Sequence, residues 1–251
     1  MNEEGAVPLR SHLVELRKRL TYAAISVLVT TAVAFVFHEQ VLILLMEPAQ
    51  QFVDTPNGKP IFTELTEIIS VAAKTSLLVG LFVSLPFVLY QIVMFVAPGL
   101  KPKERKYLYV LMPASLLAFV VGAAFGYRVL FPPMVNFLLN FGSDVATPLI
   151  SIRSYINLML TLLFWMGLIF EIPVVTFFLA KIGLVTPEML ARNRRYAIVA
   201  AFILGAVITP TFDPINQAFV AIPIIVLYEA SVWLAKLAVR GRRRSAALNP
   251  E

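Results

Sequence analysis

The sequence INLMLTLLFWMGLIFEIPVVTFFLA, which covers Ile156–Ala180, is the longest apolar stretch of this chain. It exceeds the ~20 apolar residues that a helix needs to cross a bilayer. It holds one ionisable side chain, Glu171, and a proline follows two positions later at Pro173. The stretch therefore predicts a transmembrane helix with a single carboxyl group in its interior.

Glu171 is expected to be functional, because an ionised carboxylate is costly in hydrocarbon and such residues mark sites of activity or contact. Pro173 donates no N–H, so it frees the carbonyl of Ile169 and is expected to kink the helix beside the acid. A protonated Glu171 could donate to that carbonyl or to a polar group on another helix. The alternative is a neutral buried acid that only holds helices together.

The whole chain has the composition of a membrane protein. Its hydrophobic content is 59% and its charged content 14%, against about 45–50% and about 25% in globular proteins. We expect one all-α membrane domain over residues 1–251, with a leader at 1–19 and six spans at approximately 20–37, 71–96, 107–128, 154–182, 195–208 and 216–237. The fifth and sixth spans are expected to be short. Residues 134–141 are expected to form an amphipathic helix on the outer surface, after a break at Pro132–Pro133.

The basic residues predict the orientation. With the N-terminus inside, 17 of the 21 Lys and Arg residues fall in inside segments, whereas Lys59, Arg128 and Arg153 fall outside and Lys74 lies near the outer end of the second span. This is a strong positive-inside bias. Without the short fifth span the basic tail would lie outside, so six spans with both termini inside are expected. The net charge of +6 thus reports topology and contact with anionic lipid, not nucleic acid.

The sequence offers no catalytic pattern. It has no cysteine, and it lacks Gly-x-Ser-x-Gly, His-Glu-x-x-His and a P-loop. Its two histidines, His12 and His38, are expected at opposite membrane faces, where they cannot share a metal. We therefore expect no enzyme activity, no metal and no cofactor. No cleavable signal peptide is visible, and we place the chain in a prokaryotic cytoplasmic membrane.

Two acids lie among bases on the predicted cytoplasmic side: Glu15 in Glu15–Arg19, and Glu104 in Lys101–Lys106. Acids in such clusters usually pair with their own neighbours, which contributes little at a surface. Alternatively, each carboxylate could accept a guanidinium in bidentate fashion, the geometry in which arginine and carboxylate match best. The residues alone leave both interpretations open.

Several motifs together resemble a known family. They are His12-Leu13-Val14-Glu15-Leu16-Arg17-Lys18-Arg19, Pro48, Phe95-Val96-Ala97-Pro98-Gly99-Leu100, Phe170-Glu171-Ile172-Pro173, and Thr209-Pro210 with Asp213 and Gln217. In this order they resemble TatC, the multi-spanning subunit of the twin-arginine protein translocase. Two residues separate Pro210 from Asp213, where some members have one.

The resemblance implies a six-helix concave cup, with both termini in the cytoplasm, that binds signal peptides carrying an Arg-Arg pair. By position it assigns signal binding to Glu15, Glu104, Arg17, Leu16 and Phe95. It assigns docking of single-span TatA/TatB-type partners to Glu171, Thr209, Gln217 and Asp213, and structural roles to Pro48, Pro173 and Pro210. It further implies export of folded proteins driven by the proton-motive force, and self-association in a multi-subunit receptor complex.

Two other classes compete with this interpretation. A secondary transporter or ion channel would use Glu171 as its proton or ion site, and it predicts paired broken helices in related halves. A structural scaffold would leave the Glu15 and Glu104 pattern unexplained. Lys74 could pair with Glu171, but the two are expected at different depths, so we expect Lys74 to snorkel outward.

Overall fold

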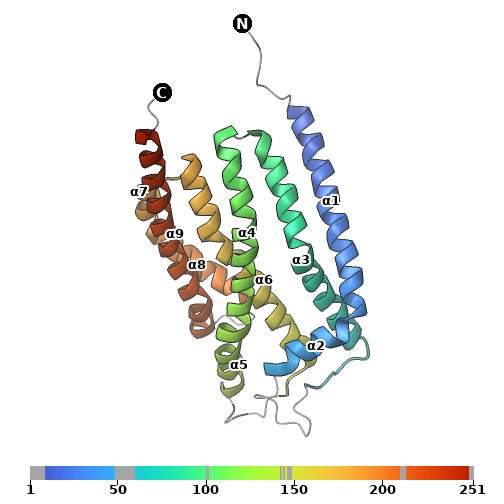
Figure 1. The fold of residues 1–251 in the computed structure, drawn as a ribbon. Helices are drawn as coiled ribbons and strands as arrows, with labels where there is room; N and C mark the ends of the chain where they lie inside the picture. The colour runs from blue at the N-terminus through green and yellow to red at the C-terminus, as the bar shows by residue number, and fades with distance from the viewer. Residues whose placement is uncertain are drawn as a thin grey trace.

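The chain is a bundle of long helices that cross the molecule from end to end (Figure 1). The computed structural model describes residues 9–48, 60–99, 102–141, 143, 145, 149–209 and 213–248, apart from the side chains of 9–11, 102–104, 106 and 241–248. The helices are α1 (Leu9–Val36), α2 (His38–Met46), α3 (Glu67–Val96), α4 (Pro102–Phe125), α5 (Phe131–Asn140), α6 (Ile152–Ile182), α7 (Pro187–Arg192), α8 (Arg194–Ile208) and α9 (Pro214–Leu248).

Five long segments are apolar enough to cross a membrane: His12–Val36, Glu67–Gly99, Tyr107–Asn140, Ile152–Ile182 and Pro214–Arg240. Both ends of the chain lie at the same end of the bundle (Figure 1), which requires an even number of crossings. The 15-residue α8 runs back between α6 and α9 and supplies the sixth. The expected all-α, six-span fold with a short fifth helix is therefore confirmed.

The sixth helix is longer than expected. Helix α9 has 35 residues, so the expectation of a short sixth helix is wrong. Its apolar part, Pro214–Arg240, is long enough to cross a membrane by itself. The helix then continues as far as Leu248, because the basic and alanine-rich residues of the tail favour a helix.

The third span also differs from the expectation. A π-helical turn at Gly126–Leu130 joins α4 directly to α5, so Pro132 and Pro133 do not break the chain. They occupy the first turn of α5, directly after the π-helical turn. Met134 is fully buried, so the apolar face of α5 packs into the protein core instead of lying on a membrane surface.

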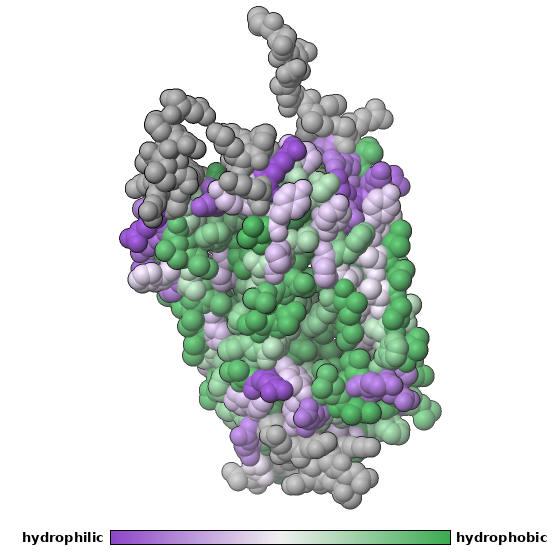
Figure 2. Space-filling model, in the orientation of Figure 1, coloured by the Kyte–Doolittle hydropathy of each residue, from purple (hydrophilic) through white to green (hydrophobic). Residues whose placement is uncertain are grey.

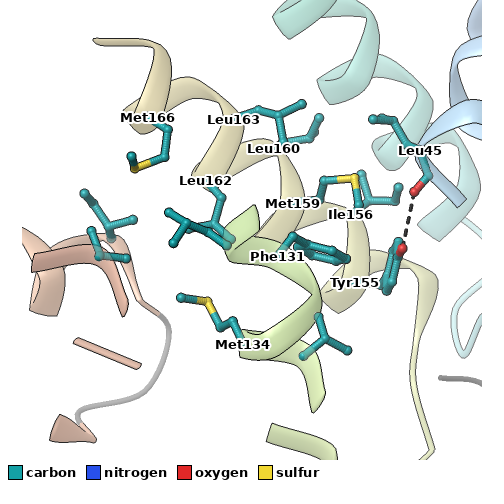
Figure 3. Close-up of a cluster of buried hydrophobic side chains, with 14 of the residues drawn as sticks. Leu45, Phe131, Met134, Tyr155, Ile156, Met159, Leu160, Leu162, Leu163 and Met166 are labelled. Atoms are coloured by element: carbon teal, nitrogen blue, oxygen red, sulfur yellow. Dashed lines mark hydrogen bonds between the residues drawn. The ribbon is translucent and has the colours of Figure 1, made fainter. Parts of the chain in front are cut away.

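Helix α6 is the centre of the fold. Phe131, Met134, Ile156, Met159 and Leu162 form its best-buried cluster, with α5 and α6 side chains pointing toward one another (Figure 3). The hydroxyl of Tyr155 donates to the carbonyl of Leu45 at 3.3 Å, which ties α2 to α6 (Figure 3).

Glycines let α4 and α6 approach closely. A Cβ at Gly122 would overlap the carbonyl of Met166, and one at Gly167 would lie 2.6 Å from the ring of Phe119. Small residues at such crossings are the usual means by which membrane helices gain packing contacts in lipid. On the outside, apolar side chains form a belt across the middle of the molecule, and polar ones gather toward its ends (Figure 2).

A buried acid closes the end of the bundle opposite the termini. Glu67 at the start of α3 is 1% exposed, and its carboxylate accepts from the backbone N–H groups of Thr63 at 2.7 Å, Glu64 at 3.3 Å and Arg153 at 2.9 Å. Arg153 also pairs with Glu64 at 2.7 Å. Glu67 therefore joins the first turns of α3 and α6, and such a buried carboxylate is tolerated because its oxygens are satisfied.

Candidate functional site

The first candidate site is a pocket of about 490 Å³ between α1 and α3, at the end of the bundle that holds both termini. We call it the Glu15 pocket. Residues of α1 and α3 line it together: Val14, Glu15, Lys18, Arg19, Tyr22, Tyr90 and Gln91. Two of these, Tyr90 and Gln91, come from a part of the sequence about 70 residues away from the α1 motif and were not predicted.

The Glu15 carboxylate is already engaged within the chain. One oxygen, Oε1, accepts from Arg19 Nε at 2.9 Å and from Arg19 Nη2 at 2.6 Å. Gln91 Oε1 accepts from the remaining nitrogen of the same guanidinium, Nη1, at 3.4 Å. The pocket thus holds a carboxylate with a guanidinium docked on it, in the half-exposed setting that an arginine ligand would meet.

The other predicted signal-binding residues lie in different surroundings. The ring of His12 stacks on Phe95 with centroids 4.4 Å apart, so α3 brings Phe95 to the α1 motif as the prediction requires. Leu16 and Arg17 are exposed and do not line the Glu15 pocket. The side chain of Glu104 lies outside the described residues, although its backbone belongs to α4.

The second candidate site is an apolar groove of about 490 Å³ between α5, α6 and the end of α8. We call it the Thr209 groove. Its polar groups come from Ser154, Asn157 and Thr161 on α6 and from Thr209, facing Leu138 and other apolar neighbours. Asn157 and Thr161 are four residues apart and so share one helix face, a pattern inside an apolar span that could have marked this groove from the sequence.

The first turn of α9 is capped by a side chain. Asp213 Oδ1 accepts from the backbone N–H of Asn216 at 2.7 Å, and Oδ2 accepts from its side-chain nitrogen at 2.9 Å. Asp213 is therefore the N-cap of α9, with Pro214 in the first helical position. Gln217 is half-buried, and Pro210 lies outside the described residues.

Gly205 sets the distance between α8 and α9. A Cβ there would lie 2.9 Å from the carbonyl oxygen of Gln217. We expect Gly205→Val to destabilise the protein by about 1–3 kcal/mol, the usual cost of overpacking. Thermal unfolding in detergent measures this. Ala200→Val, at an exposed position of the same helix, is the matched control and should change little; equal losses in both would contradict a specific contact at Gly205.

Glu171 lies elsewhere. Ser115 of α4 lies close to its carboxyl group, and the Oε1 atom of that group is buried without a hydrogen-bond partner. Thr161, the last α6 residue of the Thr209 groove, is ten residues away, or about 15 Å along the helix. The structure therefore does not bring Glu171 together with Thr209, although both were predicted to dock partners.

The remaining predicted residues have structural surroundings. Pro48 lies two residues after the end of α2 and is half-buried, and Pro173 is buried inside α6. Lys74 Nζ donates to Asn157 Oδ1 at 3.1 Å, and Asn157 is about 21 Å from Glu171 along α6. The expectation that Lys74 and Glu171 lie at different depths is confirmed.

Comparisons with known proteins agree with one another. A family model described as Sec-independent protein translocase protein (TatC) matches residues 11–223. The protein of that name from Carboxydothermus hydrogenoformans is 37% identical over 234 residues, which are 93% of this chain and 95% of the relative. The one from Aquifex aeolicus is 39% identical over 239 residues, which are 94% of this chain and 98% of the relative. The crystal structure of the twin-arginine translocase receptor TatC matches with a TM-score of 0.80 and 38% identity, over 90% of this chain and 99% of that one.

Proposed function

This chain belongs to the TatC family of Sec-independent protein translocase proteins, and we propose that it is the signal-recognition subunit of a twin-arginine translocase. It is a multi-pass membrane protein of a protein-transport system, and its family is one of translocase receptors, not enzymes. In our proposal it lies in a prokaryotic cytoplasmic membrane with both termini in the cytoplasm. It binds Arg-Arg signal peptides of folded proteins there and exports them, driven by the proton-motive force, with single-span TatA/TatB-type partners and further copies of itself.

The Glu15 pocket is the observation that carries the proposal. A docked guanidinium already occupies its carboxylate, so the site has the geometry for the side chain that defines the signal. Arg19 is the internal occupant, and a partly exposed i, i+4 ion pair stabilises by only about 0.3–0.5 kcal/mol. Hydrogen bonds to a charged group contribute about 1.5–3 kcal/mol. A well-placed signal arginine can therefore displace Arg19 from Glu15.

The Thr209 groove supports the second half of the proposal. Its polar groups lie among apolar side chains inside the membrane-crossing part of the bundle. A polar residue on a partner helix would seek such groups, because hydrocarbon offers no other hydrogen-bond partner. We assign this groove, with Thr209 and Gln217, to one partner helix. Glu171, which is about 15 Å further along α6, serves a separate contact.

A photocrosslinking experiment tests signal recognition. A photoreactive phenylalanine analogue at Tyr90, which lines the Glu15 pocket, should crosslink to an Arg-Arg signal peptide and only weakly to its Lys-Lys counterpart, because lysine does not match a carboxylate bidentately. The same analogue at Tyr196, exposed on α8, is the control. Equal crosslinking of both peptides at Tyr90 would contradict recognition in this pocket.

The orientation predicts accessibility. Because the chain has no cysteine, single cysteines can be introduced at Asn57 and at Ala246 and labelled from outside with a membrane-impermeant reagent. Asn57 should be labelled in intact cells, and Ala246 only after the membrane is opened. The reverse pattern would exclude the six-span orientation with both termini inside.

A further inference from the structure

A second intramembrane groove lies beside the Thr209 groove and is not used by the function proposed above. It has a volume of about 500 Å³ and is lined by α1, α3 and α6. We call it the Lys74 groove. It shares Asn157 and Thr161 with the Thr209 groove, so these two residues form the ridge between the two.

The polarity of the Lys74 groove changes along its length. Lys74 and Asn157 are joined by a hydrogen bond of 3.1 Å. They form the part of the groove nearest the first turns of α3 and α6, which Glu67 joins. Lys74 is seven residues into α3, or about 10 Å from its first residue. Deeper in the membrane the groove is lined by Leu77, Leu81, Leu160, Phe164 and Trp165. One end of the groove is thus cationic and polar, and the remainder is apolar.

The cation lacks a counter-ion among the described residues. The side chain of Lys74 is exposed, and its hydrogen-bond partner, Asn157, is neutral. No carboxylate in the described part of the chain forms an ion pair with it. A lysine in a transmembrane helix is costly unless it reaches the interface or a partner of opposite charge. An anion at the polar end of the groove would therefore stabilise Lys74.

We propose that the Lys74 groove binds an anionic phospholipid, with the headgroup phosphate on Lys74 and Asn157 and one acyl chain along the apolar floor. The lipid belongs to the leaflet opposite the termini, the outer one in the orientation proposed above. A phospholipid matches this groove, because its charged headgroup would lie at the polar end and its acyl chain along the apolar remainder. The exposed Lys74 cation favours an anionic lipid over an apolar helix, because only the lipid brings a negative charge to it.

Tryptophan fluorescence tests the site directly. The chain has two tryptophans, and Trp165 lines the groove, whereas Trp233 is 66% exposed on α9. The full-length Trp233→Phe protein is reconstituted into phosphatidylcholine vesicles that contain an equal mole fraction of chain-brominated phosphatidylglycerol or chain-brominated phosphatidylcholine. We expect phosphatidylglycerol to quench Trp165 at a concentration roughly fivefold lower, the factor that one lysine contributes near an anionic surface.

Variants decide where the headgroup binds. Lys74→Gln should abolish the preference for phosphatidylglycerol, and Lys74→Arg should keep it, which separates loss of charge from loss of fold. Lys181→Gln, beside Tyr107 near the other end of the bundle, is the matched control and should leave it intact. Equal quenching by both lipids in the parent, quenching by neither, or a preference that survives Lys74→Gln would each overturn the proposal. Quenching by neither would mean that a protein segment fills the groove.

Discussion

Replacement of Glu15 with glutamine is expected to weaken the binding of an Arg-Arg signal peptide by ~1.5–3 kcal/mol, or about 10- to 150-fold. Glutamine keeps the size of the side chain but loses the charge that makes a guanidinium contact strong. Arg19 occupies the carboxylate in the free protein. The net binding free energy from the incoming arginine is therefore the difference between its contact with Glu15 and the Arg19 contact that it replaces. The loss should therefore lie nearer the lower figure. Titration of a labelled signal peptide into the purified protein measures it.

Three controls show whether the effect is specific. Glu188→Gln removes one exposed negative charge on α7, outside the Glu15 pocket, and should leave binding unchanged. Arg19→Gln removes the internal competitor and should strengthen binding about twofold, in line with the small energy of an i, i+4 pair. A Lys-Lys peptide should bind poorly to the parent and lose little in the Glu15 variant. A similar loss for both peptides would indicate a general effect of charge or folding.

Glu104→Gln is expected to act in the same direction and by a similar amount, because the family resemblance assigns this acid the second guanidinium. If each carboxylate binds its own arginine, the two losses should add. If Arg-Arg binding is unchanged in both variants, these acids are surface residues that pair only with their own neighbours.

Glu171→Ala is expected to abolish most transport and to reduce crosslinking to the single-span partners, with signal binding unchanged. The alanine variant removes the buried carboxyl group, including the Oε1 atom that has no hydrogen-bond partner within the described residues and is therefore free for a partner helix. Glu171→Gln keeps a donor, an acceptor and a similar volume, so it should retain much of the transport. Transport assays, partner crosslinking and peptide titration on both variants test this.

The comparison between glutamine and alanine also distinguishes docking from proton transfer. A transporter that uses Glu171 as its proton site would be as inactive with glutamine as with alanine, because neither residue titrates. If both variants are inactive while partner crosslinking is intact, the docking role of Glu171 is wrong. Ser115→Ala is a useful companion, since it removes the polar side chain near Glu171 without changing the acid, and it should produce an intermediate loss.

The sequence by itself determined the fold class and the six membrane spans, and it predicts their orientation. Long apolar runs such as Ile156–Ala180 predict spans because hydrocarbon excludes any backbone that does not satisfy its own hydrogen bonds. Basic residues predict sidedness because they are retained on one face. The α1 motif around Glu15 and the Phe170–Pro173 motif pointed to the family. Each of these signals is local, so it can be read without knowing which helices are neighbours.

For α5 and α9 the sequence predictions differ from the structure, because hydropathy shows neither what a helix packs against nor where it ends. Whether Met134 faces lipid or protein depends on α6 being beside it, and a periodic apolar face is the same in both cases. The sequence predicts a tail at the basic end of α9 because hydropathy falls there, although helix propensity does not, and the structure continues the helix.

Only the tertiary structure decided which polar groups meet. Gln91 contacts Arg19 across 72 positions of sequence, and Lys74 meets Asn157 across 83. Glu171 lies near Ser115 of α4 and apart from Thr209, although the family resemblance assigns both to partner docking. The physical reason is that helices in lipid pack through small residues and close crossings, such as Gly122 and Gly167. Those crossings set the register between helices, which no hydropathy pattern within a single helix contains.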